Sequence, residues 1–382
     1  MEEKRVRILA PWMPLYREQF FRRLIQLGSK DNICYEIYSG KPAFDATGRS
    51  DASSADDFFT PIRTREVKFK SRSILFHKLD QGWKKPDLII AEHAIRNFVV
   101  YKWVLWHRPA RLALWGHGKT YTKPKTNFEE WLKTILVNRA DWFFGYTQNG
   151  VESVINKGLK PQKATVVRNS TDTKYLKHLM NSVKSETVAK FKTENNIGVG
   201  PVGVFIGALD PSKRIDFLIS SSVEVHHQLP DFELLIFGDG PELAKVLAAR
   251  EKYSFIKYCG RADLETQALV SKFAKIILMP GRVGLIAVDS FTLGLPIITT
   301  SWPWHAPEIE YLVPNENSII CNDTIKDYAS AVIGLLRDGD RLAALRRKCT
   351  EDSKSYSIEI MAQNFHQGVK SALAQSKIRN IP

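Results

Sequence analysis

Short runs of β-branched and aromatic residues alternate with helix-like segments through almost the whole chain, and this alternation constrains its fold more than any other feature. It is typical of parallel sheets whose crossover helices cover both faces. The predicted strands of the first half are VRILAPW, ICYEIYS, REVKFK, DLIIAEH, RLALWGH, DWFFGYT and ATVVRNS. Those of the second half are PVGVFIGA, FELLIFG, SFIKYCG, KIILMPG and LPIITTS. The expected class is therefore α/β.

The length of 382 residues exceeds what one hydrophobic core ordinarily serves, so two domains are expected. The polar stretch 169–200 marks the boundary between them. We expect two Rossmann-like parallel-sheet domains, residues 1–180 and 181–355, that face a central cleft. Residues 356–382 are expected to form a C-terminal helical tail that packs back on the first domain. In such domains the ligands bind at the carboxyl ends of the strands.

The net charge of +14 is confined to the first half of the chain. Residues 1–180 hold 32 Lys and Arg against 18 Asp and Glu, whereas residues 181–382 hold 23 of each kind. A one-sided basic field usually faces an anionic partner, such as lipid headgroups, nucleic acid or a phosphorylated substrate. A chance distribution of surface charge is the competing explanation. A strand over REVKFKSR and a helix over FHKLDQGWKK are predicted to add to the basic surface.

Several classes of protein are disfavoured by composition. No segment offers the roughly 20 consecutive apolar residues of a membrane-spanning helix, and the N-terminal apolar run is too short for a secretory signal. The four cysteines lack Cys-x-x-Cys spacing, which fits a reducing cytoplasm and argues against a zinc site. The Asp-x-Asp at 338–340 is read as a helix cap. No cofactor and no metal are expected.

Two strand-to-helix junctions of the second half carry residues suited to binding an anion. In FIGALDPSKRIDFLI, Gly207 ends a strand, and Lys213 and Arg214 open the next helix. Cations beside helix-terminal amides form an anion site, although a solvated basic turn is the alternative. In FGDGPE, Gly238 would let a ligand approach the backbone, and an ordinary turn explains this motif equally well.

The third junction, PGRVGLIAVDSFTLGLP, combines a glycine turn with an acid in an apolar helix. The amides of Val283, Gly284 and Leu285 are expected to point outward from the helix N-terminus, where a pyrophosphate fits, and Arg282 supplies charge. Asp289 follows a little over one turn into the helix. A carboxylate there can accept both hydroxyls of a ribose. A surface-facing aspartate is the alternative.

The order of these motifs resembles the donor half of glycosyltransferase family four (glycosyl transferases group one), which are retaining nucleotide-sugar enzymes with the two-domain GT-B fold. The resemblance covers roughly residues 201–312 and rests on KR-x-D-x-L-I, GDGPE, G-x-V-G-L-x-x-x-D and PEIEYL. It implies that Lys213 binds the donor phosphates and that Asp289 binds the ribose. It also implies that Gly284 and Leu285 contribute pyrophosphate-binding amides.

The chain departs from the family pattern at two positions. Gly281 stands where the family usually has a glutamate, and Ala208 stands where it usually has an arginine. Arg214 and Arg282 are the cations that could compensate for the missing arginine. The missing glutamate commonly touches the donor sugar, so the resemblance leaves recognition of that sugar open.

The first half carries the candidates for catalysis and acceptor binding. His117 lies between two glycines just after a strand, in ALWGHGKTY. A histidine framed in this way is expected to face the crevice, although a structural loop histidine is the alternative. The resemblance implies that His117 lies near the transferred sugar, as the catalytic candidate. Tyr16 and Arg17, at the start of the helix after APWMPL, are the predicted acceptor-binding residues.

The segment RNFVVYKWVLWHRPAR interleaves aromatic and basic residues. Such a pattern suits the headgroup boundary of a membrane, and a buried crossover helix explains it equally well. Its aromatic residues Tyr101, Trp103 and Trp106 alternate with the basic residues Arg96, Lys102, Arg108 and Arg111.

Together these features predict a retaining, metal-independent hexosyltransferase. It would move a sugar from a UDP- or GDP-sugar to a membrane-associated, lipid-linked or phosphorylated acceptor, in cell-envelope polysaccharide or glycolipid synthesis. The expected location is cytoplasmic, on the inner face of the plasma membrane, with the N-terminal domain on the anionic surface and no nucleic acid bound. Two alternatives stay open: a catalytically inactive GT-B relative that binds membranes, and a nucleotide-sugar 2-epimerase.

Overall fold

The computed structural model describes residues 2–10, 12–40, 57–69, 72–78, 85–93, 100–101, 103, 110–121 and 127–375. The chain splits into two compact units. Unit 1 comprises Met1–Asn169 and Ile358–Pro382, and unit 2 comprises Ser170–Ser357. Both units contain a parallel sheet with helices, as the sequence predicts. No helix of the described ranges is long and apolar enough to cross a bilayer.

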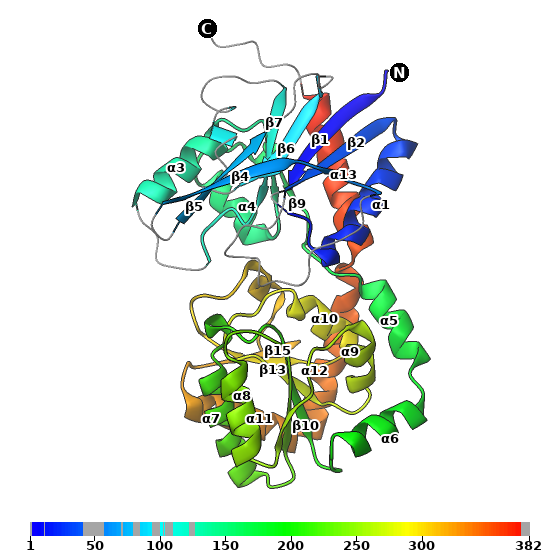
Figure 1. Ribbon diagram of the computed structural model, residues 1–382, viewed down its shortest axis with the longest axis vertical. Helices are drawn as coiled ribbons and strands as arrows, with labels where there is room; N and C mark the ends of the chain where they lie inside the picture. Colours follow the sequence, from blue (N-terminus) through cyan, green and yellow to red (C-terminus); the bar gives the residue numbers. More distant parts are fainter. Residues whose placement is uncertain are drawn as a thin grey trace. The chain divides into compact units, whose positions relative to one another are not determined.

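Unit 1 is built on a seven-stranded sheet in the order β3-β2-β1-β6-β7-β8-β9, with every pair parallel (Figure 1). The inner strands are buried on both faces, which is why their sequences are continuously apolar. The strands are β1 (Lys4–Ala10), β2 (Ile33–Ser39), β3 (Thr60–Pro61), β6 (Leu88–Glu92), β7 (Arg111–Gly116), β8 (Trp142–Gly145) and β9 (Ala164–Val166).

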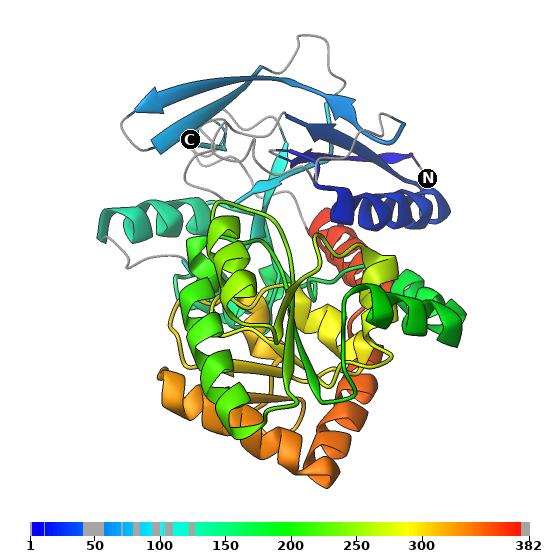
Figure 2. The ribbon, with the colours of Figure 1, turned by 60° about the horizontal axis from the view of Figure 1, so that its bottom comes forward.

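The last helix of the chain, α13, completes unit 1. It lies beside α1 in both views (Figures 1 and 2), and its Phe365 ring stacks on Phe144 of β8 at a centroid distance of 4.3 Å. Both rings are fully buried. The helices of this unit are α1 (Glu18–Lys30), α3 (Asn127–Asn138), α4 (Gln148–Ile155) and α13 (Ile358–Ala374), with 3-10 turns η1 (Leu15–Arg17) and η3 (Pro161–Lys163).

Unit 2 has a six-stranded parallel sheet in the order β12-β11-β10-β13-β14-β15. In Figure 1, α7, α8 and α11 lie on one side of this sheet, and α9, α10 and α12 on the other. The strands are β10 (Val202–Ile206), β11 (Glu233–Phe237), β12 (Ile256–Tyr258), β13 (Ile276–Leu278), β14 (Ile297–Thr300) and β15 (Ser318–Cys321). The helices are α5 (Thr173–Ser182), α6 (Ser185–Glu194), α7 (Ile215–Gln228), α8 (Leu243–Lys252), α9 (Leu264–Val270), α10 (Ile286–Leu293), α11 (Ile325–Arg337) and α12 (Gly339–Asp352), with turns η4 (Pro211–Lys213), η5 (Pro307–Tyr311) and η6 (Ser353–Ser355).

The boundaries between the two units lie at 169/170 and 357/358, whereas boundaries at 180 and 355 were expected from the sequence. The first boundary lies earlier in the chain than expected because α5, whose sequence is largely polar, belongs to unit 2. This helix packs on α9 and α10, and its Leu176 is completely buried in the core of unit 2. Asp338 caps α12, since its side chain accepts a hydrogen bond from the Arg341 amide at 2.9 Å. The interpretation of the Asp-x-Asp as a helix cap is therefore confirmed.

Two predictions about the first half need correction. The strand REVKFK does not join the parallel sheet, because β4 (Arg63–Phe69) pairs antiparallel with β5 (Arg72–Lys78) in a separate two-stranded ribbon, seen in Figure 2. The predicted helix FHKLDQGWKK is wrong at its start, since its first three residues end β5. Residues 79–84 of that predicted helix lie outside the described residues.

The aromatic-basic segment is only partly described, at residues 100, 101 and 103. Trp103 is buried in a core cluster of unit 1 with Val100 and Leu114. This burial favours the interpretation as a crossover helix over the one in which Trp103 faces a membrane.

Phe365→Ala tests the contribution of α13 to unit 1. Removing a fully buried aromatic ring should lower the free energy of unfolding of unit 1 by about 3–5 kcal/mol. Urea unfolding followed by hydrogen exchange in β7 and β8 measures this change separately from unit 2. The control is Phe191→Ala in α6 of unit 2, where the ring is only partly buried. Equal protection of β8 in Phe365→Ala and wild type would contradict the packing role of α13.

Candidate functional site

The topology of unit 2 predicts a ligand site at the carboxyl ends of β10 and β13. These strands are neighbours, and the chain continues from β10 toward β11 on one side and from β13 toward β14 on the other. A switch of strand order opens a crevice beyond the strand ends, where ligands bind in open α/β sheets. The η4 turn follows β10, and a second turn leads from β13 into α10.

Lys213 ends the η4 turn, which Asp210 and Pro211 shape. The Asp210 carboxylate accepts a hydrogen bond from the Ser212 amide at 2.8 Å, and Pro211 stands at the start of the turn. The Lys213 ammonium donates to the Arg282 carbonyl at 2.5 Å and so joins the two strand ends. Burial lowers the pKa of Lys213 to about 8, although the Asp210 carboxylate opposes this shift. Lys213 is therefore cationic at neutral pH, in surroundings that screen it poorly.

The backbone between β13 and α10 is paired within the protein at most of its polar groups. The Arg282 amide donates to the Ser212 carbonyl at 2.8 Å. The Val283 amide donates to Nδ1 of His305 at 3.1 Å, and the Val283 carbonyl accepts from the Ala306 amide at 2.8 Å. The prediction that the Val283 amide points toward a ligand is therefore wrong, because a buried histidine already uses it.

The amides of Gly284 and Leu285 differ from that of Val283. Neither makes a hydrogen bond with any part of the chain that the structure describes. They precede the first turn of α10, where the helix dipole places partial positive charge. A Cβ at Gly284 would meet only the Ala306 side chain, in ordinary contact at 3.7 Å. Two such amides beside a lysine form an arrangement suited to an anion.

Gly281 has no room for a side chain. A Cβ there would lie 2.4 Å from the Ser212 carbonyl oxygen and 2.6 Å from the Lys213 carbonyl carbon. Both distances are shorter than side-chain carbons tolerate, and both involve backbone atoms that cannot turn aside. The glycine that replaces the family's glutamate therefore lets the η4 turn rest directly on the turn after β13.

Asp289 lies in the first turn of α10, which ends at Gly294 in a left-handed cap with φ 65°. The Thr171 hydroxyl donates to Asp289 Oδ1 at 2.6 Å. Burial raises the pKa of Asp289 to about 6, and the Thr171 hydrogen bond opposes this shift. Asp289 is partly buried beside the fully buried Val288. This burial disfavours the alternative of a surface-facing, freely solvated aspartate.

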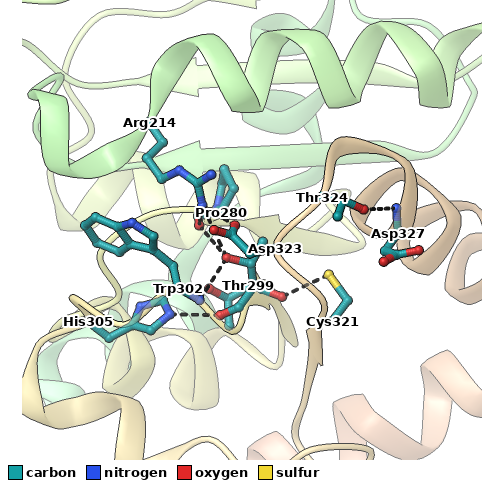
Figure 3. A network of polar contacts seen from close by, with 10 residues as sticks. Arg214, Pro280, Thr299, Trp302, His305, Cys321, Asp323, Thr324 and Asp327 are labelled. Carbon is teal, nitrogen blue, oxygen red and sulfur yellow. Dashed lines mark hydrogen bonds and ion pairs between the residues drawn. The ribbon is translucent and has the colours of Figure 1, made fainter.

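Arg214 is held by the protein itself (Figure 3). Its guanidinium forms an ion pair with Asp323 and lies 3.4 Å from both Thr300 Oγ1 and the Pro280 carbonyl oxygen. It also lies over the Phe217 ring, 4.3 Å from the centroid. The sequence analysis assigned this charge to the donor phosphates, but Asp323 already neutralises it. Arg214 therefore acts as a brace between α7 and the end of β14.

Two predicted glycines and one arginine lie at the same edge. Gly238 has φ 156°, and a Cβ there would lie 1.9 Å from the Gly207 carbonyl oxygen, so close backbone packing alone demands glycine. Gly207 itself lies near Lys213, whose Cε would be 3.6 Å from an added Cβ. The Arg282 guanidinium is partly buried and donates to the Trp304 carbonyl at 3.4 Å.

In unit 1, His117 follows β7 and is exposed. Its ring lies 4.8 Å from the Tyr146 ring and 6.0 Å from the Tyr121 ring, measured between centroids. The next residue, Gly118, has φ 72° and lies against the backbone of Gly150, so this position of the loop requires glycine. The structure thus places His117 at the carboxyl end of a strand with its side chain open to solvent.

The two predicted acceptor residues of unit 1 behave differently. Tyr16 is 41% exposed, whereas Arg17 is only 5% exposed. The Arg17 guanidinium lies over the rings of Tyr16, Trp115 and Tyr146 at 5.1–5.3 Å and donates to Met361 Sδ at 3.4 Å. The expectation that Arg17 opens to a ligand therefore needs correction, because aromatic rings and α13 cover its charge.

Sequence reasoning missed two residues of the unit 2 site, His305 and Thr171. His305 lies in SWPWHAPE, directly after the predicted strand LPIITTS, and Thr171 follows the predicted strand ATVVRNS. Polar residues just beyond strand ends are the signal that could have drawn attention to both.

Comparisons with known proteins agree with this architecture. Residues 200–338 match the family described as glycosyl transferases group 1. The GtfA subunit of the UDP-N-acetylglucosamine–peptide N-acetylglucosaminyltransferase of Streptococcus pneumoniae is 24% identical over 277 residues, which are 69% of this chain and 53% of that protein. An uncharacterized glycosyltransferase of Methanocaldococcus jannaschii is 23% identical over 62% of this chain and 64% of its own length. Among solved structures, Anabaena HepE in complex with UDP superposes with a TM-score of 0.65 at 12% identity, covering 97% of this chain and all of HepE.

These matches confirm the resemblance drawn from the sequence motifs. The fold is that of GT-B proteins, and residues 200–338, which lie in unit 2, match the glycosyl transferases group 1 family. The alignments span about half of the pneumococcal relative and just under two thirds of the archaeal one.

Gly281→Ala should destabilise unit 2 by about 1–3 kcal/mol, because the new Cβ overlaps the η4 backbone. Gly281→Glu, which restores the residue usual in the family, should be at least as harmful. The measurement is the unfolding temperature of unit 2 by calorimetry. Gly284→Ala is the matched control, since its Cβ has space, and should leave that temperature nearly unchanged. A Gly281→Glu variant as stable as wild type would refute this account of the turn.

Proposed function

We propose that the chain is a retaining glycosyltransferase whose unit 2 binds a UDP-sugar. The observation that carries the proposal is the juxtaposition, at one strand-order switch, of the Lys213 ammonium with the amides of Gly284 and Leu285. The family match, the UDP-N-acetylglucosamine in the name of the pneumococcal relative and the UDP in complex with HepE support the choice of a uridine nucleotide.

The diphosphate of the donor is assigned to the turn before α10. Its oxygens would accept hydrogen bonds from the amides of Gly284 and Leu285, aligned with the positive end of the helix dipole. Lys213 would supply a full positive charge from the side of η4. Because these donors are fixed before the substrate arrives, they can stabilise the charge that develops on the leaving diphosphate without reorganising.

The ribose is assigned to Asp289. A carboxylate with its charge partly desolvated accepts hydrogen bonds from hydroxyls strongly, since water competes poorly for it. Thr171 holds Oδ1 and thereby fixes the orientation of the carboxylate. The pair of ribose hydroxyls would then be read by Asp289 as in other dinucleotide-type folds.

The reaction we propose proceeds on one face of the sugar. The bond from the anomeric carbon to the diphosphate oxygen breaks, and the acceptor hydroxyl oxygen forms the new bond on the same side. The proton of that hydroxyl passes to the leaving diphosphate, so no separate protein base is needed. His117, exposed after β7 in unit 1, is the residue proposed to orient the sugar and stabilise its positive character.

The acceptor we propose is anionic and membrane-associated, either lipid-linked or phosphorylated. The support is the excess of positive charge in residues 1–180 and the exposure of Leu15 and Trp131, at 58% and 57%, in unit 1. Basic residues draw a protein to an anionic surface, and exposed apolar side chains insert at its headgroup boundary. The corresponding location is the cytoplasmic face of the plasma membrane, and the product is a cell-envelope polysaccharide or glycolipid.

We also propose that catalysis needs no metal ion. The support is the set of positive groups around the proposed diphosphate position: Lys213, the two amides and the Arg282 guanidinium. The Asp-x-Asp at 338–340 caps α12, so its first carboxylate already has a structural partner.

The first experiment is a calorimetric titration with UDP, GDP, ADP and TDP. UDP should bind most tightly, and Lys213→Ala and Asp289→Ala should each weaken it about 10- to 100-fold, the loss expected for a charge-assisted hydrogen bond. Lys275→Ala, an exposed lysine beside the amino end of β13, is the control and should bind UDP like wild type.

Unchanged UDP affinity in both site variants would refute the assignment of the pocket. If no nucleotide binds wild type, the inactive membrane-binding alternative is favoured. Release of UDP from a UDP-sugar without any acceptor would favour the epimerase alternative. Transferase activity predicts instead that release depends on an anionic, lipid-linked acceptor and persists in EDTA.

The pKa values of Asp289 and Lys213 predict a pH window for UDP binding. Asp289 accepts hydrogen bonds from the ribose much more strongly when it is ionised, so affinity should fall as pH drops through about 6. Lys213 attracts phosphate only when protonated, so affinity should fall as pH rises through about 8. Calorimetry across pH 5–9 should therefore give the highest UDP affinity between the pKa values of Asp289 and Lys213.

Two isosteric variants separate the limbs of this profile. Asp289→Asn should flatten the acid limb, apart from the nucleotide's own ionisation, and leave the alkaline limb intact. Lys213→Gln should flatten only the alkaline limb. An acid limb that is identical in Asp289→Asn and wild type would assign it to the nucleotide alone and count against Asp289.

A further inference from the structure

His305 joins two loops at the unit 2 site through both of its ring nitrogens. Nδ1 accepts the Val283 amide at 3.1 Å. Nε2 lies 2.9 Å from the Thr300 carbonyl oxygen, a contact drawn in Figure 3. An amide can only donate and a carbonyl can only accept, so Nδ1 must be bare and Nε2 must carry the hydrogen. The two backbone partners therefore fix a neutral imidazole in one tautomer.

We propose that His305 is a positioning residue that holds the turn before α10 so that the Gly284 and Leu285 amides face the donor diphosphate. This inference rests on the proposed function of unit 2 as the donor-binding unit. His305 would touch neither the nucleotide nor the reacting atoms. It would act through Val283, the residue directly before the two amides.

The pairing of Val283 explains why one ring has this influence. Its amide is bonded to His305 and its carbonyl to the amide of Ala306, at 2.8 Å, so both backbone polar groups of this residue are tied to two consecutive residues. From the opposite side the neighbouring Arg282 carbonyl is tied to Lys213. Two loops therefore hold the turn in place up to Val283. The next two amides, of Gly284 and Leu285, make no hydrogen bond with the residues that the structure describes.

The groups that face His305 keep its ring neutral. It is only 6% exposed, its ring meets Trp302 edge-on at 5.8 Å, and it lies near Lys213, Arg282 and Asp323. Burial, followed by the two cations, lowers the pKa of His305, while the Thr300 carbonyl and Asp323 oppose this shift. The direction of this shift favours the neutral ring in which Nδ1 accepts from Val283.

Three substitutions separate the two bonds of His305. His305→Asn places an amide oxygen near Nδ1 and can still accept from Val283. His305→Gln reaches the position of Nε2 and can still donate to Thr300, but does not accept from Val283. His305→Phe keeps an aromatic ring and loses both bonds. UDP affinity should fall about tenfold in the His305→Phe and His305→Gln variants, the loss expected for one hydrogen bond. The affinity of the His305→Asn variant should be close to that of wild type.

A double-mutant cycle tests the route of the effect. Leu285 has φ −59°, which proline can adopt, so Leu285→Pro deletes its amide donor with little strain. If His305 acts by aiming that amide, the losses of UDP affinity in His305→Phe and Leu285→Pro should not add. Additive losses would place the effect of His305 elsewhere and overturn the inference.

Unfolding temperatures recorded for each variant distinguish positioning from general stability. A purely structural role predicts lower unfolding temperatures with unchanged UDP affinity of the folded protein, and an Asn variant no better than Gln; either result overturns the inference. If the Phe variant does not fold, the Asn and Gln comparison still decides. If wild type binds no nucleotide at all, the proposed function fails, and this inference fails with it.

Discussion

The site of unit 2 depends on the direct backbone contact between Gly281 and the η4 turn. With no side chain between them, the carbonyl of Ser212 accepts the Arg282 amide, and the Lys213 ammonium reaches the Arg282 carbonyl. A glutamate at this position would separate the turns that follow β10 and β13. Gly281, which departs from the family pattern, and Lys213 are therefore parts of one arrangement.

The two principal charged groups of this site are shifted in the same sense, toward their neutral forms. Burial raises the pKa of Asp289 and lowers that of Lys213, because the partly dry surroundings disfavour both charges. The protein partners that hold them are a hydroxyl and a carbonyl, which are weaker than full counter-charges. A diphosphate beside Lys213 would raise the pKa of its ammonium again, so ligand binding and protonation are coupled at this residue.

The sequence predicted the parallel α/β architecture because strand and helix patterns are local. It also located Lys213, Gly284, Leu285 and Asp289 at one edge, since residues beyond neighbouring strand ends must converge. The hairpin of β4 and β5 escaped prediction because a basic apolar run suits a helix as well as a strand until its partner is known. β15 was also absent from the predicted strands.

The remaining errors concern groups paired across long stretches of chain. The Val283 amide is used by a residue 22 positions away, and Arg214 is neutralised by one 109 positions away. Arg17 is covered by Met361, which is 344 positions distant. A motif specifies which polar and charged groups a segment contains. Only the folded chain determines which of these groups are already paired within the protein.

This distinction bears on how the proposed donor would be recognised. Lys213, the two free amides and Asp289 would all contact the diphosphate or the ribose, and none of them would contact the transferred sugar. With no side chain at Gly281, the sugar loses one charged partner, a contact worth about 1.5–3 kcal/mol. The nucleotide would then provide most of the binding free energy in unit 2. Discrimination between sugars would fall to residues that the family pattern does not mark.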